Sequence, residues 1–199
     1  MTLFKDKFKI DSNRLKNWDY SSEALYFITI VTKNRKCIFG SVEDNKMVLN
    51  KNGQIIENEL LRSITIRNNW FFHNWIVMPN HIHLLIEIQA KSHIVETHRS
   101  ASTSSISTNV ETIVPKTHCG ASLQYQSGSK LSRKTDSIAS FVAIFKSVTT
   151  KQINGLESIW QTNYHDHIIR NYKRFEIIYD YIKNNPLTWE TDSINSNFK

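Results

Sequence analysis

The sequence predicts a small α+β or α/β domain built on a single sheet. Two stretches are rich in the β-branched and aromatic residues typical of strands, residues 25–32 (LYFITIVT) and 74–88 (NWIVMPNHIHLLIEI). Three others repeat apolar residues every three or four positions, as a helix face does: residues 54–63, the stretch after Ser137, and residues 172–184. Because strand-like and helix-like stretches alternate along the chain, we expect one sheet covered by helices.

Length and composition are those of one ordinary globular domain. The 199 residues are 40% hydrophobic and 22% charged, which excludes collagen-like, coiled-coil and fully disordered chains. No apolar stretch approaches the ~20 residues of a membrane span, and the N-terminus lacks the apolar core of a secretory signal. Cys37 and Cys119 are isolated, so neither a disulfide framework nor a Cys-rich zinc site is expected. We therefore expect a protein of the reducing cytoplasm with no membrane partner.

The charge balance favours a polyanionic partner without identifying one. The net charge is +7 and the isoelectric point is near 9.4. Lysine and arginine side chains that contact phosphates release condensed counterions, which makes binding to nucleic acid favourable. Many basic proteins never bind nucleic acid, so charge alone does not decide the function.

The first half of the chain predicts a strand, a turn and a helix in that order. Lys33, Arg35 and Lys36 follow the first strand in a turn. A short apolar run, MVLN, then precedes Asn52-Gly53, which is typical of a turn. From Gln54 the apolar residues recur every four positions, which predicts a helix to about Ser63.

The most informative stretch is residues 81–88, where side chains alternate strictly in character. One face of this strand would carry only aliphatic residues, namely Ile82, Leu84, Ile86 and Ile88. The other face would carry His81, His83, Leu85 and Glu87. The two histidines would lie on the same face, where they could hold one ion or phosphate. The aliphatic opposite face predicts a central strand, so the polar groups on the histidine face must meet partners. Two partly exposed surface histidines are the alternative, and a metal site would need further ligands from elsewhere.

Residues 90–136 lose all periodicity and are rich in serine and threonine, which predicts a flexible insertion within a single domain of residues 1–199. Periodicity returns at Ser137 with an amphipathic helix. We expect a strand or extended segment next, within residues 159–170, and it carries a second histidine pair, His165 and His167. This pair could compete for a metal, or it could be structural or face a substrate.

The last predicted helix covers residues 172–184 and places two tyrosines differently. Its apolar stripe consists of Phe175, Ile178, Tyr179 and Ile182, so Tyr179 is expected in the core. Tyr181 lies at the margin of the stripe, and Asn185 lies on the same side one turn later. Pro186 should end the helix, because a proline disfavours helical backbone angles at the residue before it. The alternative for Tyr181 is a packed ring with its hydroxyl in water.

Several of these segments resemble one known family. VMPNHIHLLIEI, IWQTNYHDHIIRN and DYIKNNPLTW are similar to segments of the REP-associated tyrosine transposases, which belong to the insertion-sequence-like HUH single-tyrosine transposase superfamily. The segments RLKNWDYSSEALYFITIVTKNRKCIFG and IFKSVTTKQIN also resemble that family, in the same order. The resemblance covers nearly the whole chain except the insertion and the extreme ends.

The resemblance implies a ferredoxin-like fold and a particular chemistry. The fold is a βαββαβ antiparallel sheet with helices on one face and the histidine strand in the centre. His81, His83 and Asn185 match the residues that hold a divalent ion, Mg²⁺ or Mn²⁺, and Tyr181 matches the nucleophile. The implied activity is cleavage of single-stranded DNA through a 5′-phosphotyrosine intermediate, followed by strand transfer.

The implied partner is single-stranded or hairpin DNA of the palindromic REP type, in a bacterial cytoplasm and near the nucleoid. Candidate phosphate contacts are Arg14, Lys33, Arg35, Lys146, Arg170 and Lys173. Two other functions remain open: an inactive hairpin-binding regulator of the same fold, and a phosphodiesterase of small nucleotides, which would leave Tyr181 without a role. Also open are the choice between monomer and homodimer and the roles of Glu87, His165 and His167.

Overall fold

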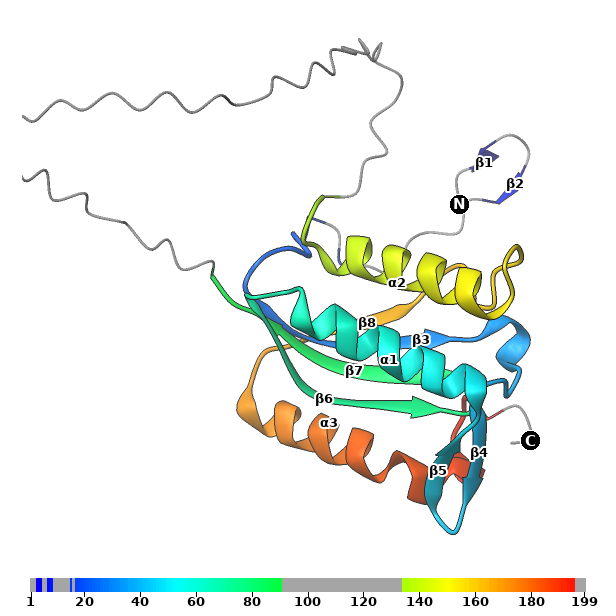
Figure 1. The fold of residues 1–199 in the computed structure, drawn as a ribbon. Helices are drawn as coiled ribbons and strands as arrows, with labels where there is room; N and C mark the ends of the chain where they lie inside the picture. Colours follow the sequence, from blue (N-terminus) through cyan, green and yellow to red (C-terminus); the bar gives the residue numbers. More distant parts are fainter. Residues whose placement is uncertain (1–2, 5–6, 9–14, 16, 91–133, 196–199) are drawn as a thin grey trace, which may run out of the picture. The chain divides into compact units, whose positions relative to one another are not determined.

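The computed structural model describes residues 3–4, 7–8, 15, 17–90 and 134–195. Its centre is a four-stranded antiparallel sheet in the order β6-β7-β3-β8 (Figure 1), made of β3 (Ala24–Val31), β6 (Trp70–Met78), β7 (His81–Ile88) and β8 (His165–Ile169). Helix α1 (Lys51–Thr65) connects β3 to β6, and α2 (Ile138–Ile153) lies between β7 and β8 in the sequence. This βαββαβ order with antiparallel neighbours confirms the predicted ferredoxin-like α+β fold.

Helices lie on both faces of the sheet. The larger core joins α1 and α2 to one face through residues such as Ile56, Leu60 and Phe141. Helix α3 (Tyr172–Asn184) covers the other face, where Ile178 and Ile182 pack with Leu85 and Ile169 (Figure 1). The expectation of helices on one face therefore holds for α1 and α2, whereas α3 forms a third layer on the histidine side.

Strand β7 occupies the centre of the sheet, as its sequence predicts. Its aliphatic residues all lie in the larger core and are at most 3% exposed: Ile82, Leu84, Ile86 and Ile88. His83 lies on the opposite face, directly across from Thr29 of β3 and Ile76 of β6. Residues directly opposite one another on neighbouring strands share a face of the sheet. Side chains of β3 and β6 therefore flank His83 on the same face.

The segment before α1 differs from the sequence prediction. The chain forms a hairpin of β4 (Gly40–Glu43) and β5 (Lys46–Leu49), whose turn residues Asp44 and Asn45 have φ values of 48° and 60°. Helix α1 begins at Lys51, so Asn52-Gly53 lies in its first turn and the predicted turn is wrong. Asn50 caps the helix by accepting a hydrogen bond from the Gly53 amide. Any Cβ at Gly53 would lie 2.2 Å from the Phe39 carbonyl oxygen, so this glycine serves close packing.

Helix α3 has the predicted bounds, but its ending differs. Asn185 keeps helical angles (φ −56°, ψ −39°), and the chain continues as the 3₁₀ helix η2 (Asn185–Thr191) with Pro186 in its first turn. At Pro186 the chain therefore changes from an α-helix to a 3₁₀ helix, and Asn185 keeps helical backbone angles. Tyr179 was expected in the core and is instead 37% exposed, because the buried stripe runs through Ile178 and Ile182.

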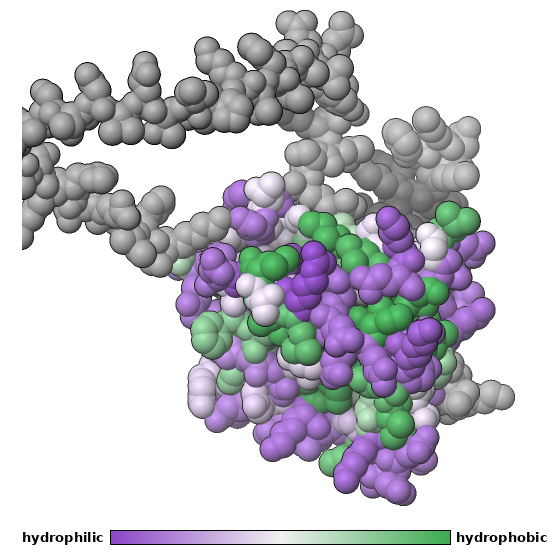
Figure 2. Space-filling model, in the orientation of Figure 1, coloured by the Kyte–Doolittle hydropathy of each residue, from purple (hydrophilic) through white to green (hydrophobic). Residues whose placement is uncertain are grey.

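The remaining elements are short. They are the hairpin of β1 (Leu3–Phe4) and β2 (Lys7–Phe8) and the 3₁₀ helix η1 (Lys33–Arg35). On the side of the molecule in Figure 2, hydrophilic side chains surround several separate hydrophobic ones. No helix in the described part of the chain is long and apolar enough to cross a membrane. The predicted insertion at 90–136 falls mainly on residues 91–133, which lie outside the described residues.

A substitution on the aliphatic face of β7 tests this architecture. Leu84 is fully buried between Ile28 and Trp75, so Leu84→Ala should lower the free energy of unfolding by about 2–5 kcal/mol. Chemical denaturation followed by circular dichroism measures the change. Leu156→Ala is the matched control, since Leu156 is 97% exposed, and it should change stability by no more than about 0.5 kcal/mol. Equal effects of the two substitutions would contradict the assigned core.

Candidate metal and nucleophile site

The two histidines of β7 point their ring nitrogens at one another. His81 and His83 are 0% and 1% exposed, and their Nε2 atoms lie 3.1 Å apart. Their positions at i and i+2 on one strand place both imidazoles on the face that α3 covers. Two nitrogens this close can share one cation or one proton.

A second layer of hydrogen bonds orients both rings. His81 Nδ1 lies 2.8 Å from Asn80 Oδ1. The Asn80 amide nitrogen donates to the carbonyl oxygens of Arg35 and Ile194, so its oxygen is left to accept from the His81 ring. His81 therefore carries its proton on Nδ1 and presents a lone pair at Nε2. His83 Nδ1 lies 2.8 Å from the Thr29 hydroxyl, which can donate or accept, so this contact holds the orientation of the second ring.

Tyr181 brings its hydroxyl to the histidine pair. The oxygen lies 3.2 Å from His83 Nε2, and the ring stands edge-on to Phe27 with centroids 6.1 Å apart. The side chain is nevertheless 40% exposed, so a substrate can reach it. Tyr181 therefore lies at the margin of the apolar stripe of α3, as predicted, and its hydroxyl points toward His83.

Two further oxygen-bearing side chains complete the cluster. Asn185 is fully buried and donates from its amide nitrogen to Asp192 Oδ2 at 3.2 Å. Within the described part of the chain, its Oδ1 has no hydrogen-bond partner. Ligand atoms of His81, His83 and Asp192 all lie within 4.8 Å of one another. Asp192, which the backbone amide of Ile194 also holds, was missed by the sequence analysis because only the path of η2 brings it back to β7.

Burial sets the protonation states of these groups. Desolvation lowers the pKa of His81 to about 4, although the negative charge of Asp192 and the Asn185 side chain oppose the shift. Desolvation and the neighbouring His81 lower the pKa of His83 well below its ordinary value. Both rings are therefore neutral at pH 7, which is the form that binds metals. Burial, and then the charge of Asp192, raises the pKa of the Tyr181 phenol, which keeps its proton.

These donors fit a divalent cation. Two neutral imidazole nitrogens and one carboxylate lie together, and Asn185 contacts that carboxylate while its amide oxygen has no hydrogen-bond partner among the described residues. An unpaired buried amide oxygen costs free energy unless a cation or donor meets it, so Asn185 Oδ1 is suited to act as a ligand. A mixed set of nitrogen and oxygen ligands is compatible with Mn²⁺ or Mg²⁺ and differs from the thiolate set of a closed structural zinc.

The other histidines lie away from this cluster. His165 and His167 of β8 face Thr29 and Phe27 across the strands, so they share the sheet face of His83 but lie two strands from it. Both are exposed. Glu87 pairs with His73 at 2.6 Å, at the opposite end of β7 from His81.

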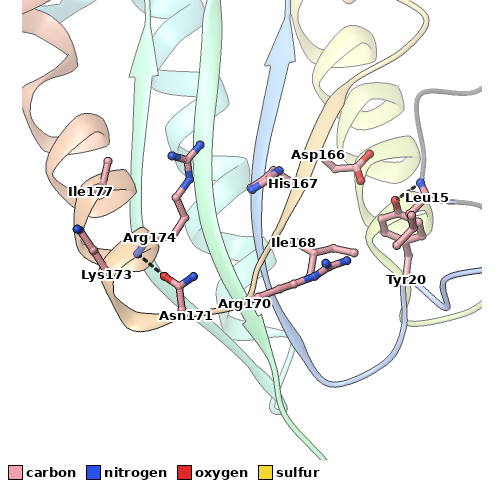
Figure 3. Close-up of a pocket in the computed structure, with 10 residues that line it drawn as sticks. All are labelled: Leu15, Tyr20, Asp166, His167, Ile168, Arg170, Asn171, Lys173, Arg174 and Ile177. Atoms are coloured by element: carbon pink, nitrogen blue, oxygen red, sulfur yellow. Dashed lines mark hydrogen bonds between the residues drawn. The ribbon is translucent and has the colours of Figure 1, made fainter.

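The predicted phosphate contacts divide into groups. Arg35 is next to the site, where it donates to the Ser193 carbonyl oxygen at 2.8 Å, and Lys33 lies 3.9 Å from Glu157. Lys146 extends from α2 to the carbonyl oxygens of Gln161 and Asn163. Arg170 and Lys173 line a hollow where β8 meets α3 (Figure 3), and Arg14 is outside the described residues.

Comparison with known proteins supplies a relative and a fold. No family model matches the chain. An uncharacterized protein of Haemophilus influenzae is 34% identical over 192 residues, which cover 92% of this chain and 91% of that protein. The structure of a REP-associated tyrosine transposase bound to a REP hairpin aligns with a TM-score of 0.55 at 19% identity, covering 90% of this chain and 74% of the other. The chain therefore belongs to the same family as the Haemophilus influenzae protein, and its fold is that of a REP-associated tyrosine transposase.

Proposed function

We propose that this protein is a metal-dependent transposase that cleaves hairpin-forming single-stranded DNA and rejoins the strands through a 5′-phosphotyrosine. The observation that carries the proposal is the hydroxyl of Tyr181, which lies 3.2 Å from His83 Nε2 at the edge of the paired histidines. The likeness of fold to a transposase solved with a REP hairpin supports a DNA hairpin as the substrate.

His81, His83, Asn185 and Asp192 would hold the divalent cation, Mg²⁺ or Mn²⁺. When bound, the ion would neutralise the non-bridging oxygens of the scissile phosphate and lower the cost of placing this anion beside a phenolate. The neutral histidines supply nitrogen lone pairs without first losing a proton. Asp192 accepts a hydrogen bond from the Asn185 amide nitrogen, which leaves the amide oxygen as the donor atom that Asn185 would offer to the ion.

Tyr181 performs the covalent step. Its oxygen attacks the phosphorus, a new O–P bond forms, and the bond from phosphorus to the 3′ oxygen breaks. The phenol gives up its proton to solvent, which reaches the partly exposed ring, and the leaving 3′ oxygen takes up a proton. A 3′-hydroxyl can later attack the phosphotyrosine and reverse the reaction with a different DNA end. No external energy source is needed, because one phosphoester replaces another.

The first test removes only the nucleophilic oxygen. Tyr181→Phe should abolish the covalent adduct between protein and hairpin DNA in Mn²⁺, while hairpin affinity stays within about threefold of wild type. A denaturing gel with labelled DNA detects the adduct. Tyr179→Phe is the matched control on the same helix and should form adduct normally. If Tyr181→Phe binds hairpin and wild type forms no adduct either, the protein is a binding regulator and the proposal fails.

The second test compares the two histidine pairs. His81→Ala should reduce cleavage by several orders of magnitude, and excess Mn²⁺ should restore little, because a buried ligand is removed. His165→Ala should cost far less, since His165 is exposed and two strands away from His83. Single-turnover cleavage of labelled hairpin DNA measures both. Equal losses would mean that the pair on β8 also acts in the reaction.

The third test concerns Asp192. Asp192→Asn keeps the shape of the side chain but removes its charge, so Mn²⁺ affinity should fall by about 10–100-fold. Calorimetric titration of the purified protein with Mn²⁺ measures the affinity without any turnover. Asp180→Asn serves as the control, because Asp180 is exposed on α3 and outside the cluster. Unchanged Mn²⁺ affinity in Asp192→Asn would exclude Asp192 from the metal site.

A further inference from the structure

We propose that the junction between β8 and α3 binds one nucleotide of an unpaired DNA strand, with the phosphate in one hollow and the base in the next. The inference rests on the proposed function and adds a site for substrate recognition away from the cleavage centre. Its two parts are a basic hollow of about 920 Å³ and an aromatic hollow of about 760 Å³. Arg170 and Asn171 line both, so the two hollows adjoin at the start of α3.

The basic hollow suits a phosphate because cationic side chains line it. Arg170, Lys173 and Arg174 surround it together with His167 (Figure 3). In the part of the chain that the structure describes, none of the three cationic side chains forms an ion pair or a hydrogen bond. Among the described residues that line the hollow, Asp166 is the only acidic one. An unbalanced group of arginine and lysine side chains attracts a phosphate, and Arg170 can bind one through two parallel hydrogen bonds.

The aromatic hollow suits a nucleobase. Tyr172 stacks on Phe175 with centroids 6.0 Å apart and an interplanar angle of 21°, yet Tyr172 remains 71% exposed. Leu25 and Ile169 add apolar wall, and the hydrogen-bonded pair of His73 and Glu87 adds polar edges. A flat aromatic base can therefore stack against a side-chain ring and hydrogen bond at its edge, which is how unpaired bases are commonly held.

The position of the junction is compatible with the cleavage centre. Tyr172 and Tyr181 lie on the same helix, nine residues apart, which is about 14 Å along its axis. Nine residues at 100° each also place Tyr172 and Tyr181 on opposite sides of the helix axis, so a strand that reaches both must cross α3. The occupant must be unpaired, because a base within a duplex has both faces covered by its neighbours and cannot stack on Tyr172.

The test measures binding without chemistry, in EDTA, with a fluorescent single-stranded oligodeoxynucleotide that carries 2-aminopurine. Tyr172→Ala should weaken binding about tenfold or more and remove the stacking-induced quenching of 2-aminopurine. Tyr172→Phe keeps the ring and should stay within about twofold of wild type. Tyr179→Ala is the matched control, since Tyr179 is an exposed tyrosine of α3 that lines neither hollow. Equal effects of Tyr172→Ala and Tyr179→Ala would overturn the base site.

A salt titration tests the phosphate site separately. Arg170→Gln should weaken binding and reduce the log–log salt slope by about 0.7, the value for one neutralised phosphate of a single strand. Lys151→Gln on α2 is the charge control and should leave the slope unchanged. An unchanged slope in Arg170→Gln would overturn the phosphate site. Because these assays need neither metal nor Tyr181, they can fail while the adduct assay succeeds, or succeed while it fails.

Discussion

The alternation of side chains along β7 is the constraint on which the rest of the structure depends. Successive residues of a strand point to opposite faces, so burying Ile82 and Leu84 against α1 and α2 forces His81 and His83 to the other side. The histidines cannot move to the surface without exposing the aliphatic face, because a shift of one residue would exchange the two sets. The free energy of the hydrophobic core thus holds the histidine pair in place, although no histidine belongs to that core.

Helix α3 turns this polar face into an enclosed site. Without a cover, the two imidazoles would be solvated surface groups with ordinary pKa values. Ile178 and Ile182 bind the helix to Leu85 and Ile169, and the chain continues through η2 to bring Asn185 and Asp192 over the histidines. The resulting desolvation keeps both rings neutral at pH 7, and the Asp192 carboxylate supplies a negative charge that suits a cation. One layer of structure therefore determines the position, protonation and charge of the site.

The same helix relates the two regions to which we assign function. Its last turn carries Tyr181 at the histidine pair, and its first turn carries Tyr172 beside the hollows at the end of β8. The helix therefore separates the two regions by about 14 Å along its axis.

The sequence by itself determined the features that depend on local periodicity. These are the alternation of strands and helices around one sheet, the bounds of α3, the aliphatic and histidine faces of β7, and the marginal position of Tyr181, because strands and helices repeat at fixed periods. The βαββαβ order followed from the resemblance to a known family. Local patterns misplaced Asn52-Gly53, which lies in a helix because Asn50 caps α1, and Tyr179, whose exposure depends on how α3 is rotated on the sheet. Only the tertiary structure decided that Asp192 joins the histidines and that Asn185 is hydrogen-bonded to Asp192 beside them. The approach of Asp192 to the histidines joins residues about a hundred positions apart through a 3₁₀ turn, and no period in the sequence encodes such a return of the chain.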